Sequence, residues 1–229
     1  PLHVPLTTPT TILALGAALA AAAALREAST GGASAPEPPA AAQQAVPGTL
    51  AAVVRAADTV VMGTVAWTRA FEIDPGDGAP MVFTEVVVRG RTLVGTPVAP
   101  LEAMRSPGST DGAEEPGALT SFLVPGGLLD GGLRGSFTAE APHRHELRTG
   151  RGIVAFCAEA HFVRAEGGEL RRPMPIGGRA GVFNTFVARD GRTIVQGRSG
   201  FGPLRTNVTL DALEADVARM RAGDAQEQR

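Results

Sequence analysis

The stretch GIVAFCAEAHFVR, residues 152–164, decides the fold class of this chain. Every second residue within it is apolar, and in an extended strand these residues would share one face: Val154, Phe156, Ala158, Ala160 and Phe162. A period of two over this length is typical of a β-strand that buries one side against a core. We therefore expect a sheet, with this segment as its most strongly marked strand.

Further strand signals lie on both sides of this segment. Three earlier segments are rich in β-branched residues and are bounded by charged or Pro-Gly positions: Thr59–Trp67, Met81–Arg89 and Leu119–Val124. Later, 181–196 predicts two short strands joined by a tight turn at Asp190-Gly191. The strands do not alternate with helices, so the sequence predicts a mainly β fold, a small antiparallel barrel or sandwich.

Two helices are expected, one at each end of this β-rich region. Thr49 can cap a short helix through Asp58, and Thr209 can cap a longer one from Leu210 to Arg221. Their apolar stripes would be Leu50, Val53, Val54 and Ala57 in the first, and Leu210, Leu213, Val217 and Met220 in the second. Residues 102–118 form a polar, Pro/Gly-rich insertion, which we expect to be mobile.

The first part of the chain predicts targeting rather than fold. Residues 11–25 (TILALGAALAAAAAL) form an apolar run, which at about 1.5 Å per residue spans about 22 Å, less than the ~30 Å core of a bilayer. This length favours a signal peptide, with a retained membrane anchor and a buried Ala-rich helix as the alternatives. We assign 1–34 to the signal peptide or anchor, 35–48 to a Pro/Ala-rich linker, and 49–229 to a single exported β-domain.

Composition excludes several classes of function. The formal net charge is −2, so no basic surface for nucleic acid is expected by default. The single cysteine excludes a disulfide framework. Aromatic residues make up 4% of the chain, too few for the stacking platform that single-stranded nucleic acid requires.

The order of short motifs along residues 49–222 resembles a family of exported bacterial β-domains of unassigned function. The motifs that carry this resemblance are Ala57–Val65, Thr84–Val88 leading to Leu93 and Gly95, Val124–Gly127, Ala141-Pro142, Ile153–Phe156, Gly181–Phe183 and Asp190–Arg192. The first two are also distantly similar to netrin-like modules with an oligonucleotide/oligosaccharide-binding barrel. The resemblance implies export and a β-barrel, and it brings no catalytic residues with it.

His143 and His145 are the candidate metal ligands. If residues 142–147 were extended, these two side chains would share a face about 6.7 Å apart, close enough to chelate one ion. A hairpin turning at Thr149-Gly150 would leave His161 about 17 Å away, which argues against a three-histidine site. Surface histidines in a loop are the alternative interpretation. Cys157 lies within an apolar strand and is expected to be a packing residue.

The glycine-rich segment after Leu119–Val124 is the candidate partner-binding surface. Two glycine pairs flank a Leu-Leu-Asp sequence in residues 126–132, but no Lys-Ser/Thr follows them, so a turn between strands is a better interpretation than a phosphate loop. Loops of this kind on a β-domain often contact partners. The residues assigned to this surface are Gly126, Gly127, Leu128 and Leu129.

Taken together, these features predict an exported, non-catalytic binding or assembly module of the cell envelope or extracellular space. Its expected partner is an envelope or extracellular protein, and nucleic acid is not expected. It would be secreted or periplasmic, contacting the membrane only if residues 11–25 are retained. The alternative is a metal-dependent hydrolase that uses His143 and His145 with Glu146 or Glu159 as third group; otherwise no cofactor is expected. A purely structural envelope component is a third possibility.

Overall fold

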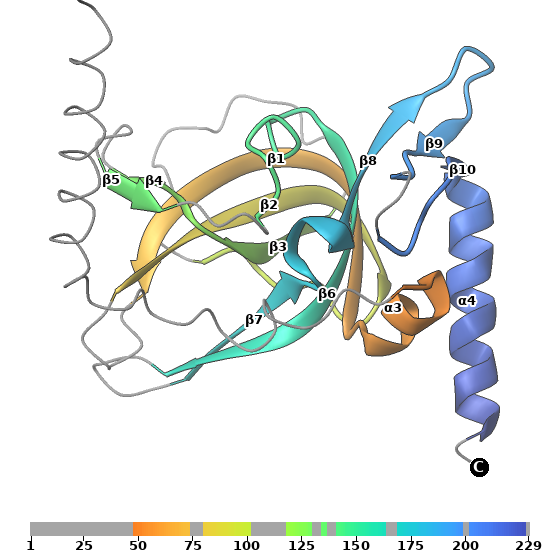
Figure 1. Ribbon diagram of the computed structural model, residues 1–229, viewed down its shortest axis with the longest axis horizontal. Coiled ribbons are helices and arrows are strands. Elements are labelled where there is room, and N and C mark those ends of the chain that lie inside the picture. The colour runs from red at the N-terminus through yellow and green to blue at the C-terminus, as the bar shows by residue number, and fades with distance from the viewer. Residues whose placement is uncertain are drawn as a thin grey trace, which may run out of the picture. The chain divides into compact units, whose positions relative to one another are not determined.

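Antiparallel β-structure dominates the residues that the computed structural model describes (Figure 1). These are residues 48–73, 80–101, 118–129, 134–136, 141–163, 169–198 and 202–227, all of which fall in one of the two compact units of the chain, Pro36–Arg229. The predicted signal or anchor segment 1–34, nearly all of the linker 35–48 and nearly all of the insertion 102–118 lie outside the described residues.

Eight of the described strands form one sheet that curls into a half-barrel (Figure 1). The ten described strands are β1 (Thr59–Ile73), β2 (Met81–Val94), β3 (Ala118–Pro125), β4 (Gly127–Leu129), β5 (Arg134–Ser136), β6 (Gly152–Val163), β7 (Glu169–Pro175), β8 (Val182–Val187), β9 (Thr193–Val195) and β10 (Val208–Thr209). Their order is β10-β9-β8-β6-β1-β2-β3, with β7 also paired to β6, while β4 and β5 pair only with each other. The prediction of a mainly β, antiparallel fold is confirmed in this form.

The predicted apolar face of β6 is buried, and so is much of its other face. All five residues of the predicted face are at most 5% exposed. On that side, Val154, Phe156 and Ala158 pack with residues of both helices. The opposite side, Ile153, Ala155 and Cys157, is also fully buried, against residues of β1, β2 and β3. The first half of β6 is therefore a central strand with a core on each side.

One edge of β6 is shared by two strands that are separated by a short excursion. β7 pairs with β6 as far as Cys157↔Pro175, and β8 resumes the pairing at Ala155↔Val182. In between, Ile176 N–H still donates to Phe156 O at 2.9 Å. The chain then leaves the sheet through the 3₁₀ helix η3 (Gly178–Gly181). We call residues 176–181 the edge excursion.

The two expected helices are present and capped as predicted. In α3 (Leu50–Ala56), which ends at Ala56 rather than at the predicted Asp58, the Thr49 hydroxyl accepts a hydrogen bond from Ala52 N–H at 3.2 Å. In α4 (Leu210–Glu227), Thr209 accepts one from Ala212 N–H at 3.3 Å. The two helices contact each other and lie on the same side of the sheet (Figure 1).

The end of α4 was predicted wrongly. The helix runs on to Glu227 rather than ending at Arg221. An ion pair between Arg55 and Asp224, at 2.9 Å, ties this extension to α3. None of the helices in the described part of the chain is both long and apolar enough to cross a membrane.

The hairpin at Asp190-Gly191 is confirmed, whereas the one considered at Thr149-Gly150 is not formed. β8 and β9 pair on either side of the first turn, and Gly191 has a left-handed φ of 83°. Residues 142–150 do not pair with β6, because β1 and β8 occupy both edges of its first half. Instead, Gly150 N–H and Arg151 O bond to the backbone of Val65 in β1, each at 2.8 Å.

Candidate functional site

Residues 141–151, which we call the histidine loop, lead into β6 as a series of turns. Glu146 N–H donates to His143 O at 2.8 Å, and Arg151 N–H donates to Arg148 O at 3.0 Å. Leu147, 5% exposed, is inserted into the core next to β1, β3 and β6. The extended conformation considered for residues 142–147 is therefore not formed, and the alternative of surface histidines in a loop describes this segment. Local turn bonds and the burial of one leucine determine the loop instead.

Both candidate metal ligands are exposed in this loop. The rings of His143 and His145 stack with centroids 5.5 Å apart and an interplanar angle of 15°. Among the described residues, no group of three His, Cys, Asp or Glu side chains is placed to hold a metal ion. Cys157 is fully buried, as expected for a packing residue, and burial raises the pKa of its thiol.

A hollow of about 520 Å³, which we call the loop groove, separates the histidine loop from the bend that joins β3 to β4. Strands β1, β2 and β3 contribute Thr68, Ala70, Thr84 and Val124. The bend contributes Pro125–Leu128, and the histidine loop contributes Ala141, Pro142, Arg144, His145, Leu147 and Arg148. Gly126, Gly127, Leu128 and His145 thus meet at one groove, whereas Leu129 and His143 do not line it.

The two glycines of the bend allow the chain to lie directly on the sheet. Gly126 and Gly127 have φ values of 88° and 153°. A Cβ on Gly127 would lie 2.5 Å from Thr84 Oγ1 and 2.8 Å from Ala70 Cβ. Gly126 N–H donates to Val82 O, and its carbonyl accepts from Thr84, both at 2.7 Å. These bonds confirm a structural turn, because both polar groups of Gly126 are already engaged.

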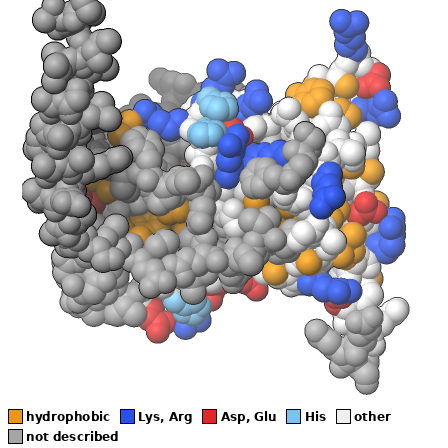
Figure 2. Space-filling view, in the orientation of Figure 1, with side chains coloured by type: hydrophobic (Ala, Val, Ile, Leu, Met, Phe, Trp, Pro, Cys, Tyr) orange, Lys and Arg blue, Asp and Glu red, His pale blue; other side chains and the backbone are white. Residues whose placement is uncertain are grey.

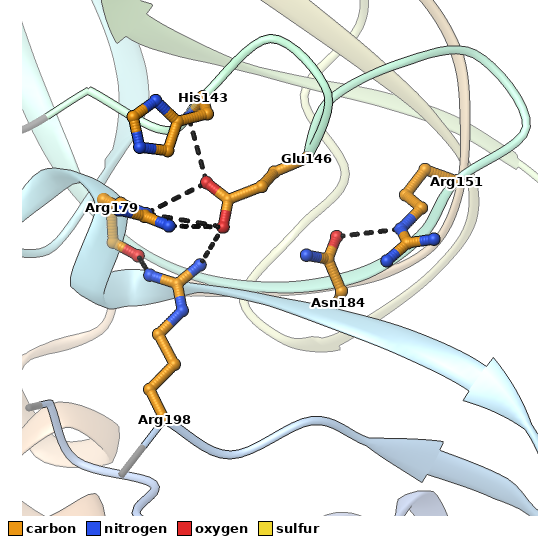
Figure 3. A network of polar contacts seen from close by, with 6 residues as sticks. All are labelled: His143, Glu146, Arg151, Arg179, Asn184 and Arg198. Carbon is orange, nitrogen blue, oxygen red and sulfur yellow. Dashed lines mark hydrogen bonds and ion pairs between the residues drawn. The ribbon is translucent and has the colours of Figure 1, made fainter. Parts of the chain in front are cut away.

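Next to the groove, one buried carboxylate is held by two arginines from distant parts of the chain (Figure 3). Glu146 is 4% exposed. Its oxygens accept hydrogen bonds from His143 N–H at 2.9 Å, from Arg179 Nε at 3.1 Å and from Arg198 Nη2 at 2.9 Å. Burial by itself raises the pKa of Glu146, but these hydrogen bonds and the two positive charges outweigh it, so the pKa is lowered.

The two guanidinium groups are crowded around this single carboxylate. Arg179 lies on the edge excursion, and Arg198 follows β9. The Arg198 side chain is 15% exposed, donates to Arg179 O at 2.5 Å and lies over the ring of Phe183, 5.9 Å from its centroid. Burial lowers the pKa of Arg198, Glu146 opposes that shift, and the charge of Arg179 adds to it. The arginines therefore attract Glu146 and repel each other.

These residues border a second hollow of about 470 Å³, which we call the arginine cavity. It is lined by His145, Glu146, Arg151, Arg179, Asn184, Gln196, Gly197 and Arg198. Arg151 donates to Asn184 Oδ1 at 3.3 Å. His145 lines both hollows. In Figure 2, basic side chains are gathered around histidines on the upper part of the visible face.

The arginine cavity was not predicted from the sequence, where Glu146 was considered only as one of two options for the third group of a metal-dependent hydrolase. Glu146 is 33 residues from Arg179 and 52 from Arg198. Neither arginine belongs to a motif, and all 21 basic residues of the chain are arginine, so no composition signal distinguishes these two. Only the meeting of the histidine loop with the edge excursion brings the three side chains together.

No family model matches this chain, and neither a curated protein nor a solved structure matches it. The function is therefore argued from the geometry and charge of the loop groove and the arginine cavity.

Proposed function

We propose that this chain is an exported binding or assembly module, without catalytic activity of its own, that holds a segment of an envelope or extracellular protein in the loop groove. The observation that carries the proposal is the meeting of Gly126–Leu128 and the histidine loop at this one groove. Binding residues are often carried by loops that a rigid scaffold positions, and here the sheet is the scaffold.

The groove has the size and chemistry for a peptide segment. Its volume of about 520 Å³ lies within the range of about 300–1,000 Å³ that is common for ligand pockets. Leu128 and Val124 supply apolar surface, and the exposed Arg144 and Arg148 supply positive charge. No acidic side chain belongs to the described lining. This combination favours a segment that carries both apolar and acidic side chains.

The same lining favours binding over catalysis. Its titratable side chains are Arg144, His145 and Arg148, and the hydroxyl of Thr84 already donates to Gly126 O. Nucleophilic catalysis requires a nucleophile in contact with a base, and the described lining pairs none. The hydrolase hypothesis would use Glu146 or Glu159 as its third group. Two arginines already hold the carboxylate of Glu146, and that of Glu159 lies beside His161 and Arg171 on the exposed part of β6.

The proposal places the protein outside the cytoplasm, secreted or periplasmic. Its support is the apolar run at residues 11–25 and the proline-rich spacer that follows. The half-barrel sheet agrees with the fold that the resemblance to exported β-domains implies. If residues 11–25 are retained after export, the module would be anchored in the membrane.

A site-specific cross-linking experiment tests the proposal. A photo-reactive amino acid replaces Arg148 in the groove or, as the matched control, the exposed Arg219 on α4. We expect one envelope protein to cross-link at position 148 only, and the second substitution Leu128→Asp to abolish the adduct. Equal labelling from both positions, or the same adduct in the Leu128→Asp variant, would contradict the proposal. In the same sample, the N-terminal peptide of this chain itself shows whether residues 11–25 were removed.

A metal measurement separates the proposal from the hydrolase hypothesis. If the chain is a binding module, the purified protein should contain no stoichiometric metal that depends on the histidine loop. Elemental analysis of the wild type and the His143→Ala variant checks this. Stoichiometric metal that is lost in the variant would contradict a purely binding role and favour metal-dependent hydrolysis.

A further inference from the structure

The second half of β1 has one backbone edge with which no described strand pairs. β1 pairs with β2 along nearly its whole length, but its pairing with β6 ends at Thr64↔Gly152. Val65 is also bonded on that side, to Gly150 N–H and Arg151 O of the histidine loop, each at 2.8 Å. Beyond Val65, the described strands supply no neighbour for this edge. In Figure 1, β1 forms the upper rim of the arch and β2 lies beneath it.

The ladder between β1 and β2 shows which backbone groups point to this edge. Val82 O accepts from Gly126 N–H at 2.7 Å, so the backbone of Val82 is turned away from β1. Its partner Glu72 is then turned away from β2, because the two residues of such a pair both face outward. The direction alternates along a strand, and no register shift interrupts residues 67–73. The N–H and C=O groups of Thr68 and Ala70 therefore point away from β2 as well. We call the backbone at these two residues the β1 edge.

The β1 edge borders the loop groove, since Thr68 and Ala70 both line it. The bend crosses the face of the sheet here: a Cβ on Gly127 would lie 2.8 Å from Ala70 Cβ. The β4 and β5 strands that follow the bend pair only with each other. A row of strand N–H and C=O groups without a neighbouring strand is a template for another strand. The groove thus offers backbone pairing as well as side-chain contacts.

We propose that the loop groove takes its partner segment as an extended strand, added to β1 at Thr68 and Ala70, in which acidic and apolar side chains alternate. This inference rests on the proposed function and states how its segment binds. The side chains of an added strand alternate between the two faces of the sheet. Those on the groove side would meet the exposed Arg144 and Arg148, which favours acidic residues. Those on the opposite side would lie near the half-buried Phe71, which favours apolar residues.

The charge of the groove favours such a partner over a second copy of this chain. Two copies that paired their β1 edges about a twofold axis would place two grooves with the same arginine side chains next to each other. Like charges that face each other oppose association, whereas an acidic segment is attracted.

The ligand class is tested with synthetic heptapeptides, blocked at both ends and titrated into the full-length purified protein at constant ionic strength. The probe alternates glutamate and valine, and one control alternates lysine and valine. A second control has the composition of the probe, with its glutamates and valines in two separate blocks. We expect the probe to bind about tenfold or more tightly than either control. No binding of the probe, or equal affinity for a control, would overturn the proposal.

Amide hydrogen exchange, followed by NMR, tests the place and the mode of binding in the unaltered protein. The amides of Thr68 and Ala70 should exchange rapidly in the free protein and about tenfold or more slowly with the probe bound. The amide of Phe71 is the internal control, because it points to β2 and should be protected in both states. Unchanged exchange at Thr68 and Ala70 when the probe binds would overturn strand addition.

A pair of proline variants tests the same edge by substitution. Ala70→Pro removes an N–H that points away from β2, so it should weaken binding of the probe about tenfold or more. Arg189→Pro lies in the exposed β8–β9 turn, outside the groove lining, and should leave the affinity unchanged. Unchanged binding in Ala70→Pro, or an equal loss in Arg189→Pro, would overturn the proposal. If Ala70→Pro does not fold, the exchange measurement on the wild type decides.

The outcomes separate this inference from the proposed function. A cross-link from position 148, together with unchanged exchange at Thr68 and Ala70, would keep the groove as a binding site and overturn only strand addition. A dimer of the purified protein that Ala70→Pro abolishes would assign the β1 edge to a second copy and overturn the partner proposed here.

Discussion

Glu146 shows how one buried side chain can set the shape of a loop. Its carboxylate accepts from His143 N–H within the histidine loop and from Arg179 and Arg198 on segments far along the chain. The loop has no strand pairing with β6, so these bonds, the burial of Leu147 and the backbone bonds of Gly150 and Arg151 to Val65 hold it in place. Residues of this loop line both the loop groove and the arginine cavity.

Glu146→Gln should therefore destabilise the protein strongly. The change leaves Arg179 and Arg198 close together without a negative charge, and breaking a buried pair of this kind costs about 3–5 kcal/mol. Glu159→Gln is the control, because Glu159 is exposed and its contacts with His161 and Arg171 are surface pairs worth at most about 1 kcal/mol. Urea denaturation of both variants measures the difference, and equal losses would contradict the role given to Glu146.

The stability of the wild type should also depend on pH through this residue. The pKa of Glu146 is lower in the folded protein than its ordinary value of 4.5, so the unfolded chain takes up the proton first as the pH falls. The stabilisation by Glu146 is thus complete above pH 4.5 and is lost as the pH falls through the folded-state pKa. Denaturation experiments between pH 7 and pH 3 should show that the free energy of unfolding decreases less with falling pH in Glu146→Gln than in the wild type. An equal decrease in both proteins would contradict this assignment.

Gly127 tests the close contact between the bend and the sheet. Gly127→Ala should destabilise the protein and distort the loop groove, since its Cβ would lie 2.5 Å from Thr84 Oγ1. Gly191→Ala is the matched control: its φ is 83° and nothing lies within 4 Å of the added Cβ, so only the left-handed backbone costs energy, about 1 kcal/mol. Thermal melts should show the larger loss for Gly127→Ala, and a larger loss at Gly191 would contradict the packing argument.

At the scale of elements, α4 acts as a cover for one side of β6. Leu213 and Val217 are buried in the same cluster as Val154 and Phe156. Since most of the stability of a helix in a protein comes from packing of its apolar face, this contact is what α4 contributes to the domain.

Leu213→Ala should lower the free energy of unfolding by about 2–5 kcal/mol, because it opens a cavity at a side chain that is 1% exposed. Arg219→Ala on the exposed side of α4 removes only a surface pair with Asp216 and should be nearly neutral. Chemical denaturation measures both variants. A similar small effect for the two would indicate that α4 does not cover the core in solution.

At the scale of the whole molecule, residues 98–101 link β3 to β7. This segment belongs to no strand, and the two strands that it links are not paired with each other in the curled sheet. Ser121 N–H of β3 donates to Val98 O at 2.8 Å, and Arg172 of β7 donates to Ala99 O at 2.5 Å. Leu101 N–H donates to the buried carboxylate of Glu85 at 2.7 Å. Residues 98–101 thus connect β3 to β7, which share no strand pairing.

Because the chain divides into two compact units at residue 35, we expect residues 36–229 to fold without the preceding segment. The described core clusters all lie between Leu50 and Met220, so the truncated chain should keep them. Its thermal unfolding should be one cooperative transition within a few degrees of the full chain. A large decrease in melting temperature would show that residues 1–35 contribute to the fold.

Much of the fold could be predicted, because its signals are local. The caps at Thr49 and Thr209 and the turn at Asp190-Gly191 depend on a few neighbouring residues, and all three were predicted correctly. The conformation of the histidine loop could not be predicted, since its turns depend on Leu147 and Glu146 reaching partners elsewhere in the fold. The arginine cavity could not be predicted for the same reason, because it is formed by residues that are far apart along the chain.

By itself, the sequence determined that β6 is a strand with an apolar side, because alternation at a period of two is a property of the extended backbone. It did not determine that Ile153, Ala155 and Cys157 are buried too, since that depends on β1, β2 and β3 curling over them. Likewise, only the tertiary structure brought Glu146 to Arg179 and Arg198. The pairing of β7 and β8 along one edge of β6 places the edge excursion beside the histidine loop, and no local pattern encodes that arrangement.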